Sequence, residues 1–561
     1  MLRTITRING RRNFSQFGFF EAPKHITNEP IKPFTANDKL DWELLQNEIK
    51  SFNENKTSVP LVIGGEKIFD RKTATIINPS NHGKLLGEYA TATSDDALSA
   101  VEASLMAKSK WAGLPFADRA AIFLRAAELI STKYRHKMLA ATMLGQGKNI
   151  FQAEIDCVAE LIDFFRFNVK YASELYRSQP VASSTGVWNR SEYRPLEGFI
   201  YAVTPFNFTA IAGNLIGAPA LMGNTVVWKP SASSILSNYL LMEILEESGL
   251  PKGVINFIPG NPVEVSKAVL NHEKFSALHF TGSTQVFGSL WSNIANNVSN
   301  GKYKEFPRIV GETGGKNFHL IDSTANIDNA VYNTIRGAFE FQGQKCSATS
   351  RAYISKSIWP EFKEKLIKSV NELKAENCTV NLQGFIGPVI HEGSFNKVTN
   401  AISPISNDKD LTLIAGGKFD KSVGYFINPT VVETSNPDHS FMKDEFFGPL
   451  LTVYVYEDNK IDEILTKIDT TTKYGLTGAV FSTNRENIRK YEERLRYSAG
   501  NFYINDKSTG AVVGQQAFGG SRLSGTNDKA GASSLLSRFV SPRSIKESFG
   551  EITSYKNPSN F

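Results

Sequence analysis

A cysteine between a glycine turn and small hydroxyl residues is the first candidate for chemistry. Cys346 lies in FEFQGQKCSATSR, residues 339–351, and the 561-residue chain has three cysteines in all. Nearby backbone N–H groups and little surrounding bulk lower the pKa of a thiol and admit a substrate, so this segment favours a reactive thiolate. An arbitrary cysteine is more often a small buried hydrophobe. The remaining motifs must decide between these two interpretations.

Two other side chains could complete a site for acyl transfer. Asn207, in TPFNF, follows a predicted strand, where its amide N–H could donate to a developing oxyanion. The alternative is an ordinary turn asparagine. Glu312, in GETGGK, is flanked by glycines that let a substrate approach, so it could act as a general base. The alternative there is a carboxylate that caps the following helix.

Three further motifs near strand ends could hold a nucleotide. Lys229, in WKPS, could bind ribose hydroxyls or a phosphate, unless it is a solvated surface charge. The stretch FTGST, residues 280–284, places a glycine turn and a hydroxyl between a strand and a helix, which is a phosphate-binding arrangement. It lacks the G-x-G-x-x-G spacing. Glu445, in DEFFGP, could accept hydrogen bonds from a ribose diol or be a surface acid.

Strands that alternate with helices would position these residues. Short apolar runs between helical stretches predict βαβ units and parallel sheets, whose ligands lie at the carboxyl ends of the strands. Long helices are predicted at 95–111, 116–132 and 148–177, and a buried helix followed by a core strand within 210–228. The predicted strands fall into two series: 198–205, 224–231, 253–260 and 277–283, then 308–317, 351–355, 474–482 and 500–506.

Composition excludes several classes of protein. The hydrophobic fraction of 41% and the charged fraction of 21% are typical of a globular chain with several units. The cysteines form no CxxC pair and no metal-ligand cluster, so neither a disulfide framework nor a metal site is expected. Residues 210–228 are uncharged but interrupted by Asn, Gly and Pro, so no membrane insertion is expected. The net charge of +6 includes four N-terminal arginines, and the small remainder argues against nucleic-acid binding.

The two ends of the chain have compositions of their own. Residues 1–22 carry arginines at helical spacing and no acid before Glu21, which is typical of a mitochondrial transit peptide and predicts the matrix as the location. A disordered basic tail is the alternative. A polar arm follows this leader. Residues 181–196 are interpreted as a hairpin without a core face, which together with 531–561 would form an oligomerisation region of at least a homodimer.

Taken together and in this order, TPFNF, WKPS, FTGS, GETGGK, GQKCSA and EFFGP resemble the NAD(P)-dependent aldehyde dehydrogenase superfamily. The resemblance implies an α/β fold in three parts. They are a Rossmann-like NAD-binding domain with its N-terminal arm at 23–180 and 197–307, an α/β catalytic domain at 308–530, and a small β oligomerisation extension at 181–196 and 531–561.

The resemblance also implies roles. Cys346 would attack the aldehyde carbon, Asn207 and the backbone N–H of Cys346 would hold the oxyanion, and Glu312 would activate the hydrolytic water. Ala232 stands where many NAD-preferring members carry an acid, so NADP is not excluded. The residues expected to bind NAD are Lys229, Gly282, Ser283, Glu445, Phe447, Pro205 and Phe206.

Within the superfamily the chain resembles the branch that oxidises L-glutamate γ-semialdehyde, the open form of Δ1-pyrroline-5-carboxylate, in the second step of proline catabolism. Residues 145–156, 159–168 and 506–531 carry this likeness. It implies a possible transient contact with proline dehydrogenase. An aldehyde dehydrogenase of other specificity, a non-catalytic relative and a thioester hydrolase remain alternatives. The expected substrate-binding residues are Ser347, Gly510, Ala511, which replaces a common serine, Phe208 and Phe518.

Overall fold

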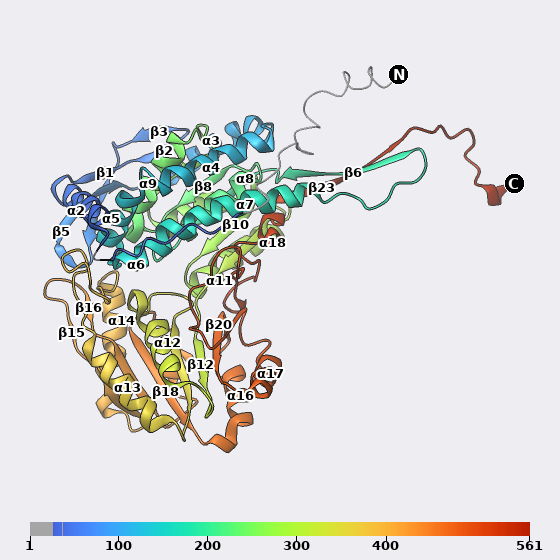
Figure 1. Cartoon of the computed structure of the whole chain (residues 1–561). Coiled ribbons are helices and arrows are strands. Elements are labelled where there is room, and N and C mark those ends of the chain that lie inside the picture. The colour runs from blue at the N-terminus through green and yellow to red at the C-terminus, as the bar shows by residue number, and fades with distance from the viewer. Residues whose placement is uncertain (1–25, 36) are drawn as a thin grey trace.

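The computed structural model describes residues 26–35 and 37–561, so the predicted leader at 1–22 lies outside the described residues. Two seven-stranded sheets dominate the body, and a two-stranded ribbon stands clear of it (Figure 1). Five neighbouring strands of the first sheet run parallel. Its order is β11 (Arg308–Glu312), β10 (Phe275–Thr281), β7 (Phe199–Val203), β8 (Val226–Lys229), β9 (Ile255–Phe257), β2 (Leu61–Ile63) and β3 (Glu66–Ile68).

Helices cover both faces of the first sheet because its strands are apolar on both sides. Ile200 and Ala202 of β7 pack in one buried cluster, and their neighbours Phe199 and Tyr201 pack in another. The first cluster includes residues of α4 (Phe116–Ser131), α5 (Arg135–Gln146), α7 (Glu160–Arg177), α8 (Thr209–Leu221) and α9 (Ile235–Glu247). The second includes residues of α3 (Ser94–Ala112), α10 (Pro262–Leu270) and α11 (Thr284–Ser299).

The second sheet is also mainly parallel, with one antiparallel edge strand, β14 (Leu411–Ala415). Its remaining order is β17 (Thr430–Thr434), β18 (Leu450–Tyr456), β13 (Thr349–Ser355), β12 (Asn317–Ile321), β20 (Thr477–Phe481) and β21 (Asn501–Ile504). One face packs on α12 (Ile327–Phe339) and α13 (Trp359–Glu372), and the other on α16 (Ile461–Thr470) and α17 (Arg485–Arg494). The predicted α/β class with two parallel sheets is confirmed.

The predicted boundary between the two α/β domains, at residue 308, differs from the point where the chain passes from the first sheet to the second. Strand β11 pairs with β10 from Ala277↔Arg308 to Thr281↔Glu312, so it belongs to the first sheet. The change from one sheet to the other therefore comes after Glu312 and not before Arg308. The apolar run at 308–312 identified a strand correctly, but a run of this kind does not say which sheet it joins.

The long helix predicted at 148–177 contains a π-helical turn. Gly147 ends α5 with a φ of +69°, and the chain then forms α6 (Ile150–Ala153), the π-helix η1 (Glu154–Ala159) and α7. A π-turn widens the helix by one residue and is often found at functional sites. Glu154, Asp156 and Glu160 lie in or beside this turn.

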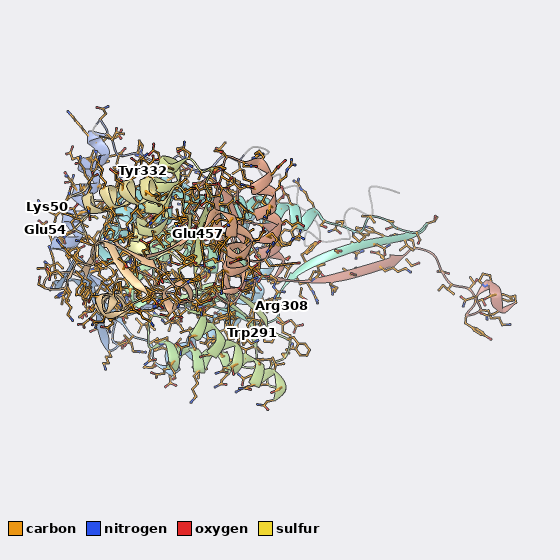
Figure 2. The ribbon with its side chains drawn as sticks, turned by 90° about the horizontal axis from the view of Figure 1, so that it is seen from below. Lys50, Glu54, Trp291, Arg308, Tyr332 and Glu457 are labelled. Carbon is orange, nitrogen blue, oxygen red and sulfur yellow. The ribbon has the colours of Figure 1, made fainter. Side chains whose placement is uncertain are left out.

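The ribbon consists of β6 (Val187–Pro195) and β23 (Val540–Ser548), antiparallel over their whole lengths. The predicted local hairpin at 181–196 is therefore wrong, because the partner of β6 lies near the carboxyl end of the chain. A strand pattern indicates extended backbone but does not name the strand it pairs with. Figures 1 and 2 show the ribbon projecting from the body in two views.

Smaller elements complete the first part of the chain. An extended arm over residues 26–35 leads to α2 (Lys39–Glu54), which packs on α5. A three-stranded sheet follows the order β1 (Thr57–Val59), β5 (Asn81–Ala90) and β4 (Thr73–Asn78). Among the described residues, none of the helices combines the length and the apolar composition needed to cross a membrane.

The remaining elements are short or lie at the edges of the second sheet. They are η2 (Ala232–Ser234), η3 (Glu340–Gly343), α14 (Glu392–Ile402), η4 (Ile405–Asn407), β15 (Phe419–Asp420), β16 (Phe426–Ile427), α15 (Ser440–Lys443), η5 (Asp458–Lys460), β19 (Tyr474–Gly475), β22 (Ser521–Arg522), α18 (Ser533–Ser537) and η6 (Pro558–Asn560).

Candidate active site

The carboxyl ends of four neighbouring parallel strands carry most of the predicted catalytic and nucleotide-binding residues. Glu312 ends β11, and the Gly282–Ser283 turn follows β10. The segment 205–207 follows β7, and Lys229 ends β8. The backbone N–H of Gly282 donates to the carbonyl oxygen of Glu312 at 3.1 Å, so the first two ends are linked directly. This edge is where parallel sheets bind their ligands.

Cys346 is held by an unusual turn at the end of α12. Phe341 and Gln342 adopt φ values of +50° and +57°, in the left-handed region that is costly for side chains larger than glycine. Gln342 is fixed there because its Nε2 donates to the carbonyl oxygens of Gly147, at 2.9 Å, and Pro388, at 2.7 Å. The strained turn therefore depends on contacts from distant segments, and it ends three residues before the thiol.

The predicted lowering of the Cys346 pKa is wrong for the chain by itself. Burial raises the pKa of this thiol to about 12, and the nearby carboxylates of Glu312 and Glu445 raise it further. The backbone N–H groups of Ser347 and Cys346 act in the lowering direction, as expected, but are outweighed. A thiol of this kind is protonated at neutral pH, so it needs a proton acceptor when it attacks a substrate.

Asn207 is tied to the same turn. Its Nδ2 donates to the carbonyl oxygen of Gln344 at 3.1 Å, which brings the amide within two residues of Cys346. This contact also fixes the orientation of the amide, because the side-chain oxygen would repel the Gln344 carbonyl. An NH₂ group has two hydrogens, so one remains to donate to a substrate oxygen. The neighbouring Phe208 lines the cavity at Cys346, whereas Asn207 is absent from its wall.

Glu312 faces the thiol from the end of β11. Its Oε2 accepts a hydrogen bond from the backbone N–H of Gly520 at 2.8 Å. Burial raises the pKa of this carboxyl well above its usual value, while the Gly520 N–H and Lys529 act in the lowering direction. A buried carboxyl with a raised pKa is a stronger base than an exposed one, which suits a group that must accept a proton from water or a thiol.

One cavity of about 250 Å³ unites the nucleophile, the base and all five predicted substrate-binding residues. Ser347 Oγ and Thr509 Oγ1 lie 2.7 Å apart, which joins the cysteine segment to the loop at 507–513. Gly510 has a φ of +101°, a conformation that a side chain would strain. The predicted residues on the cavity wall are Cys346, Glu312, Ser347, Gly510, Ala511, Phe208 and Phe518.

A group of buried charges lies at the end of the cavity beyond Ser347, and the sequence analysis missed its cations. Lys345 Nζ is 3.5 Å from Asp156 Oδ2 and 3.7 Å from Glu340 Oε2. Burial raises the pKa of Glu340, but Lys345, Lys507 and Arg336 together hold it at about 2. Lys345, Lys507 and Arg336 all line the cavity. The only sequence signal was a lysine next to the cysteine.

The predicted nucleotide-binding residues lie beside this cavity and not in its wall. Burial lowers the pKa of Lys229 to about 8. Ser283 caps α11, and its Oγ accepts from the N–H of Val286 at 3.3 Å. Glu445 Oε1 accepts from the N–H of Gly315 at 2.8 Å.

Two aromatic rings complete this region. Those of Phe206 and Phe447 meet edge to face at 5.9 Å between centroids. The described residues contain no group of three or more His, Cys, Asp or Glu placed to hold a metal ion.

Comparison with known sequences gives the family. The sequence model described as "Aldehyde dehydrogenase family" matches residues 68–545. The chain belongs to the aldehyde dehydrogenase family. The family's characteristic segments TPFNF, GETGGK and GQKCSA are the ones that the fold gathers around the cavity.

Similar proteins span nearly the whole chain. A probable delta-1-pyrroline-5-carboxylate dehydrogenase of Schizosaccharomyces pombe is 54% identical over 98% of this chain and 100% of its own length. The mitochondrial delta-1-pyrroline-5-carboxylate dehydrogenase of Homo sapiens is 45% identical over 93% and 92%. The crystal structure of the Mycobacterium tuberculosis enzyme of this name, bound with NAD, is 46% identical, covers 97% and 99%, and has a TM-score of 0.92.

Proposed function

We propose that this protein oxidises L-glutamate γ-semialdehyde to L-glutamate with NAD, and that Cys346 carries the substrate as a thioester. The observation that carries the proposal is the cavity in which Cys346, Glu312 and the 510–511 loop face one space. The relatives named as delta-1-pyrroline-5-carboxylate dehydrogenases support the choice of substrate.

The first half of the reaction forms and oxidises a carbon–sulfur adduct. Cys346 Sγ attacks the aldehyde carbon, and the thiol proton passes to a base, for which Glu312 has the raised pKa and the position. The aldehyde oxygen becomes an oxyanion, which receives hydrogen bonds from Asn207 Nδ2 and the backbone N–H of Cys346. NAD supplies the hydride acceptor that turns this adduct into a thioester.

The second half releases the acid. Glu312 first releases the thiol proton to solvent, and its carboxylate then removes a proton from a water molecule, which attacks the thioester carbon. Asn207 and the Cys346 N–H hold the second oxyanion as they held the first. The carbon–sulfur bond then breaks, L-glutamate leaves, and the thiol is restored. Division into oxidation and hydrolysis is the benefit of the covalent intermediate.

The residues next to the cavity fit NAD. The amino end of α11, directly after the Gly282–Ser283 turn, suits a pyrophosphate, because the first N–H groups of a helix have no partner within the helix. Lys229 would bind the adenosine ribose, and Glu445, already oriented by Gly315, the nicotinamide ribose. Ala232 places no acid against a 2′-phosphate, so NADP could enter the same site.

The substrate's α-carboxylate would bind where cations and N–H groups gather. Gly510, Ala511 and Ser347 offer hydrogen-bond donors, and Lys345 adds a buried positive charge that sequence reasoning did not assign. Phe208 and Phe518 would flank the aliphatic chain. These contacts would select an aldehyde that carries an amino-acid head.

Assembly and location follow from the two chain ends. A two-stranded ribbon is marginally stable alone, so β6 and β23 are expected to pair with a second copy in a homodimer. Relatives named mitochondrial support residues 1–22 as a transit peptide and the matrix as the destination. A proline utilization A structure matches 94% of this chain with 54% of its own, which supports a transient contact with a proline-oxidising enzyme.

The proposal is tested by steady-state oxidation of an aldehyde panel with NAD and with NADP. L-Glutamate γ-semialdehyde should exceed butanal and benzaldehyde in kcat/KM by at least about 100-fold, the scale expected when buried donors are left unpaired by a substrate without the head group. Equal kcat/KM for butanal would contradict the substrate assignment. Absence of any nicotinamide reduction would contradict the enzyme assignment itself.

A further inference from the structure

The arm at residues 26–35 forms part of the wall of the cavity that holds Cys346. Asn28, Glu29 and Ile31 belong to the arm that precedes α2, and all three line the cavity that holds Cys346. We propose that this arm is part of the substrate site, and that Asn28 is a positioning residue that holds the 510–515 loop where it can bind the head of the substrate. The inference rests on the proposed function, because it assigns that loop to the α-carboxylate.

The arm is bound by buried charges and not by apolar packing alone. Both oxygens of the Glu29 carboxylate are used: Oε1 accepts from Arg135 Nη1 at 2.7 Å, and Oε2 accepts from Arg166 Nη1 at 2.7 Å. The backbone N–H of Glu29 donates to Asp163 Oδ1 at 2.8 Å. Because removal of one member would leave a buried charge uncompensated, the arm has one strongly preferred position.

A second anchor follows three residues later. The backbone N–H of Lys32 donates to Glu154 Oε1 at 2.9 Å, and Arg135 binds both Glu154 and the carbonyl oxygen of Pro30. Glu154 lies in the π-turn η1, so the irregular helix faces the arm. The segments 145–156 and 159–168, which carry the likeness to the γ-semialdehyde branch, supply Glu154, Asp163 and Arg166 to this contact.

Asn28 connects this fixed arm to the substrate loop. Its Nδ2 donates to Asp163 Oδ2 at 2.7 Å and to the carbonyl oxygen of Val513 at 2.7 Å. Its Oδ1 accepts from Gln515 Nε2 at 2.9 Å. One side chain therefore uses both its hydrogens and its oxygen to join α7 to a loop that is distant in sequence.

The outer part of the loop is held by hydrogen bonds within the loop and by the buried Val513 side chain, and Asn28 adds the side-chain link from the loop to the arm. Gly510, Gly514 and Gln515 are exposed, and Gly510 and Gly514 both have positive φ values. The inner end is fixed by Ser347 and Thr509. Without Asn28 the loop loses its side-chain link to the arm and to α7, and we expect the Gly510 and Ala511 N–H groups to be held less firmly. A displacement of about 1 Å in a binding group is enough to reduce catalysis measurably.

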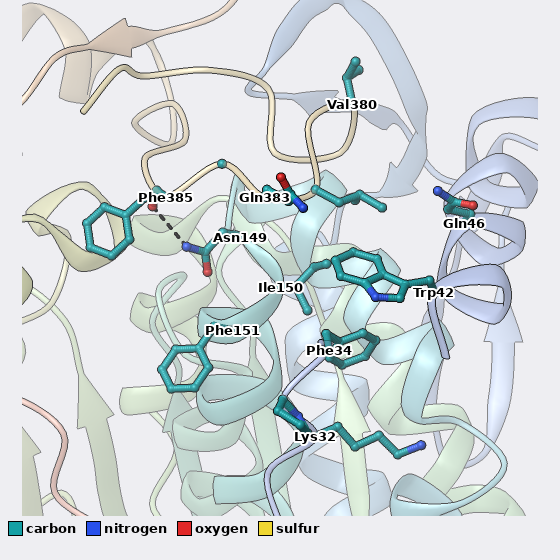
Figure 3. Close-up of a pocket in the computed structure, with 13 residues that line it drawn as sticks. Lys32, Phe34, Trp42, Gln46, Asn149, Ile150, Phe151, Val380, Gln383 and Phe385 are labelled. Carbon is teal, nitrogen blue, oxygen red and sulfur yellow. Dashed lines mark hydrogen bonds between the residues drawn. The ribbon is translucent and has the colours of Figure 1, made fainter. Parts of the chain in front are cut away.

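The arm continues away from the cavity along a separate hollow. Figure 3 shows Phe34 and Trp42 lying close to Ile150, with Lys32 below them and Gln383 on the opposite wall. The rings of Phe34 and Trp42 meet edge to face at 5.7 Å. Asn149 Nδ2 donates to the carbonyl oxygen of Phe385 at 3.0 Å, so this wall is also held in place. The arm is therefore fixed at Glu29, Lys32 and Phe34, all on the carboxyl side of Asn28.

The test measures KM and kcat separately for two aldehydes in the full chain. Asn28→Ala should raise KM for L-glutamate γ-semialdehyde about tenfold, the loss expected for one to two net hydrogen bonds. Its kcat at saturation should stay within about twofold, because Cys346, Glu312 and Asn207 are untouched. Butanal has no head group for the loop to bind, so its kinetics should not change.

Two further variants sharpen the result. Gln515→Ala removes one contact from the loop side and should raise KM for the semialdehyde by a smaller factor. The double variant should be close to Asn28→Ala alone, because the two side chains act through each other. Thr27→Ala, at the exposed neighbouring position, is the matched control and should behave as wild type.

Equal loss for both aldehydes, or a lower Tm with unchanged KM, would overturn the positioning role and leave the arm a purely structural element. The proposed function would fail differently, because wild-type protein would then show no preference for the semialdehyde over butanal. A wild type that keeps this preference, with an Asn28→Ala variant that keeps it equally, overturns the inference alone.

Discussion

The two ends of the active-site cavity are built in opposite ways. At the chemical end, Cys346 and Glu312 both have raised pKa values, because burial disfavours their charged forms. At the substrate end, Lys345, Lys507 and Arg336 hold the pKa of Glu340 at about 2, although burial raises the pKa of Glu160 on the same cavity wall to about 8. The groups at the first end can exchange protons, and the lysine and arginine side chains at the second end can recognise the α-carboxylate of the substrate.

The two ends of the cavity also differ in how far apart their residues lie in the sequence. The chemical end comes from strand ends and from a turn next to the thiol. The substrate end joins the arm at 28–32, the helices at 154–166 and the loop at 507–515, which are hundreds of residues apart. Loss of a group at the chemical end should therefore reduce kcat, and loss at the substrate end should mainly raise KM.

The largest effect is expected at the nucleophile. Cys346→Ala should lower kcat by roughly 10⁴-fold or more, because no covalent intermediate can form. Its Tm should be close to wild type, since the side chain loses only one sulfur atom. Cys378→Ala is the matched control at another buried cysteine and should keep full activity. Residual activity above one-tenth of wild type in Cys346→Ala would contradict the role of the thiol.

The second-largest loss of kcat is expected when the proposed base, Glu312, is removed. Glu312→Gln should lower kcat by about 10²- to 10⁴-fold, while Glu273→Gln, at an exposed position, should not. Because burial raises the pKa of Glu312, wild-type activity should fall as pH drops through a value above that of an ordinary carboxyl group. A pH–kcat profile without this acid limb would contradict the assignment.

The stability of Glu312→Gln has a defined sign. A folded-state pKa above the unfolded value means that the carboxyl contributes stability fully below its unfolded pKa and loses that contribution as pH rises through the folded pKa. Glutamine does not titrate, so the variant should be at least as stable as wild type at pH 8, with a smaller advantage at pH 5. Thermal unfolding at the two values checks this.

The third-largest loss of kcat is expected at Asn207, the proposed oxyanion donor. Asn207→Ala should lower kcat by about 10²- to 10³-fold, as for other single oxyanion donors. KM should change little, because Asn207 lies outside the cavity wall. Asn207→Asp is an informative partner variant, since a carboxylate beside the Gln344 carbonyl would repel both it and the oxyanion. An Asn207→Ala variant with normal kcat would remove the amide from the mechanism.

The smallest effect is expected at the substrate end. Ser347→Ala removes one donor and its contact with Thr509, and should raise KM for the semialdehyde by about five- to tenfold. Its kcat for butanal should remain unchanged. If Ser347→Ala lowered kcat for both aldehydes, the separation between the two ends of the cavity would not hold.

Sequence reasoning located the chemical end better than the substrate end. Cys346, Glu312 and Asn207 each lie in short segments whose residue types indicate the roles that we propose for them. Even there the predicted direction of the Cys346 pKa shift was wrong. The depth of burial and the nearby carboxylates, which raise this pKa, depend on tertiary packing. Asn28 gave no signal at all, since an asparagine in a polar segment has no pattern, and its partners lie far away in the chain. The predicted hairpin at 181–196 was wrong for the same reason, because β23, the partner of β6, lies far away in the chain.

The central claim is a γ-glutamyl thioester on Cys346. The most direct measurement mixes wild-type protein with L-glutamate γ-semialdehyde and NAD, quenches in acid within the first turnover to keep the substrate amine protonated, and maps the peptides by mass spectrometry. The account predicts that the peptide containing Cys346 gains the mass of one γ-glutamyl group, and only when NAD is present. An unmodified Cys346, or an adduct on Cys157 or Cys378 instead, would contradict it.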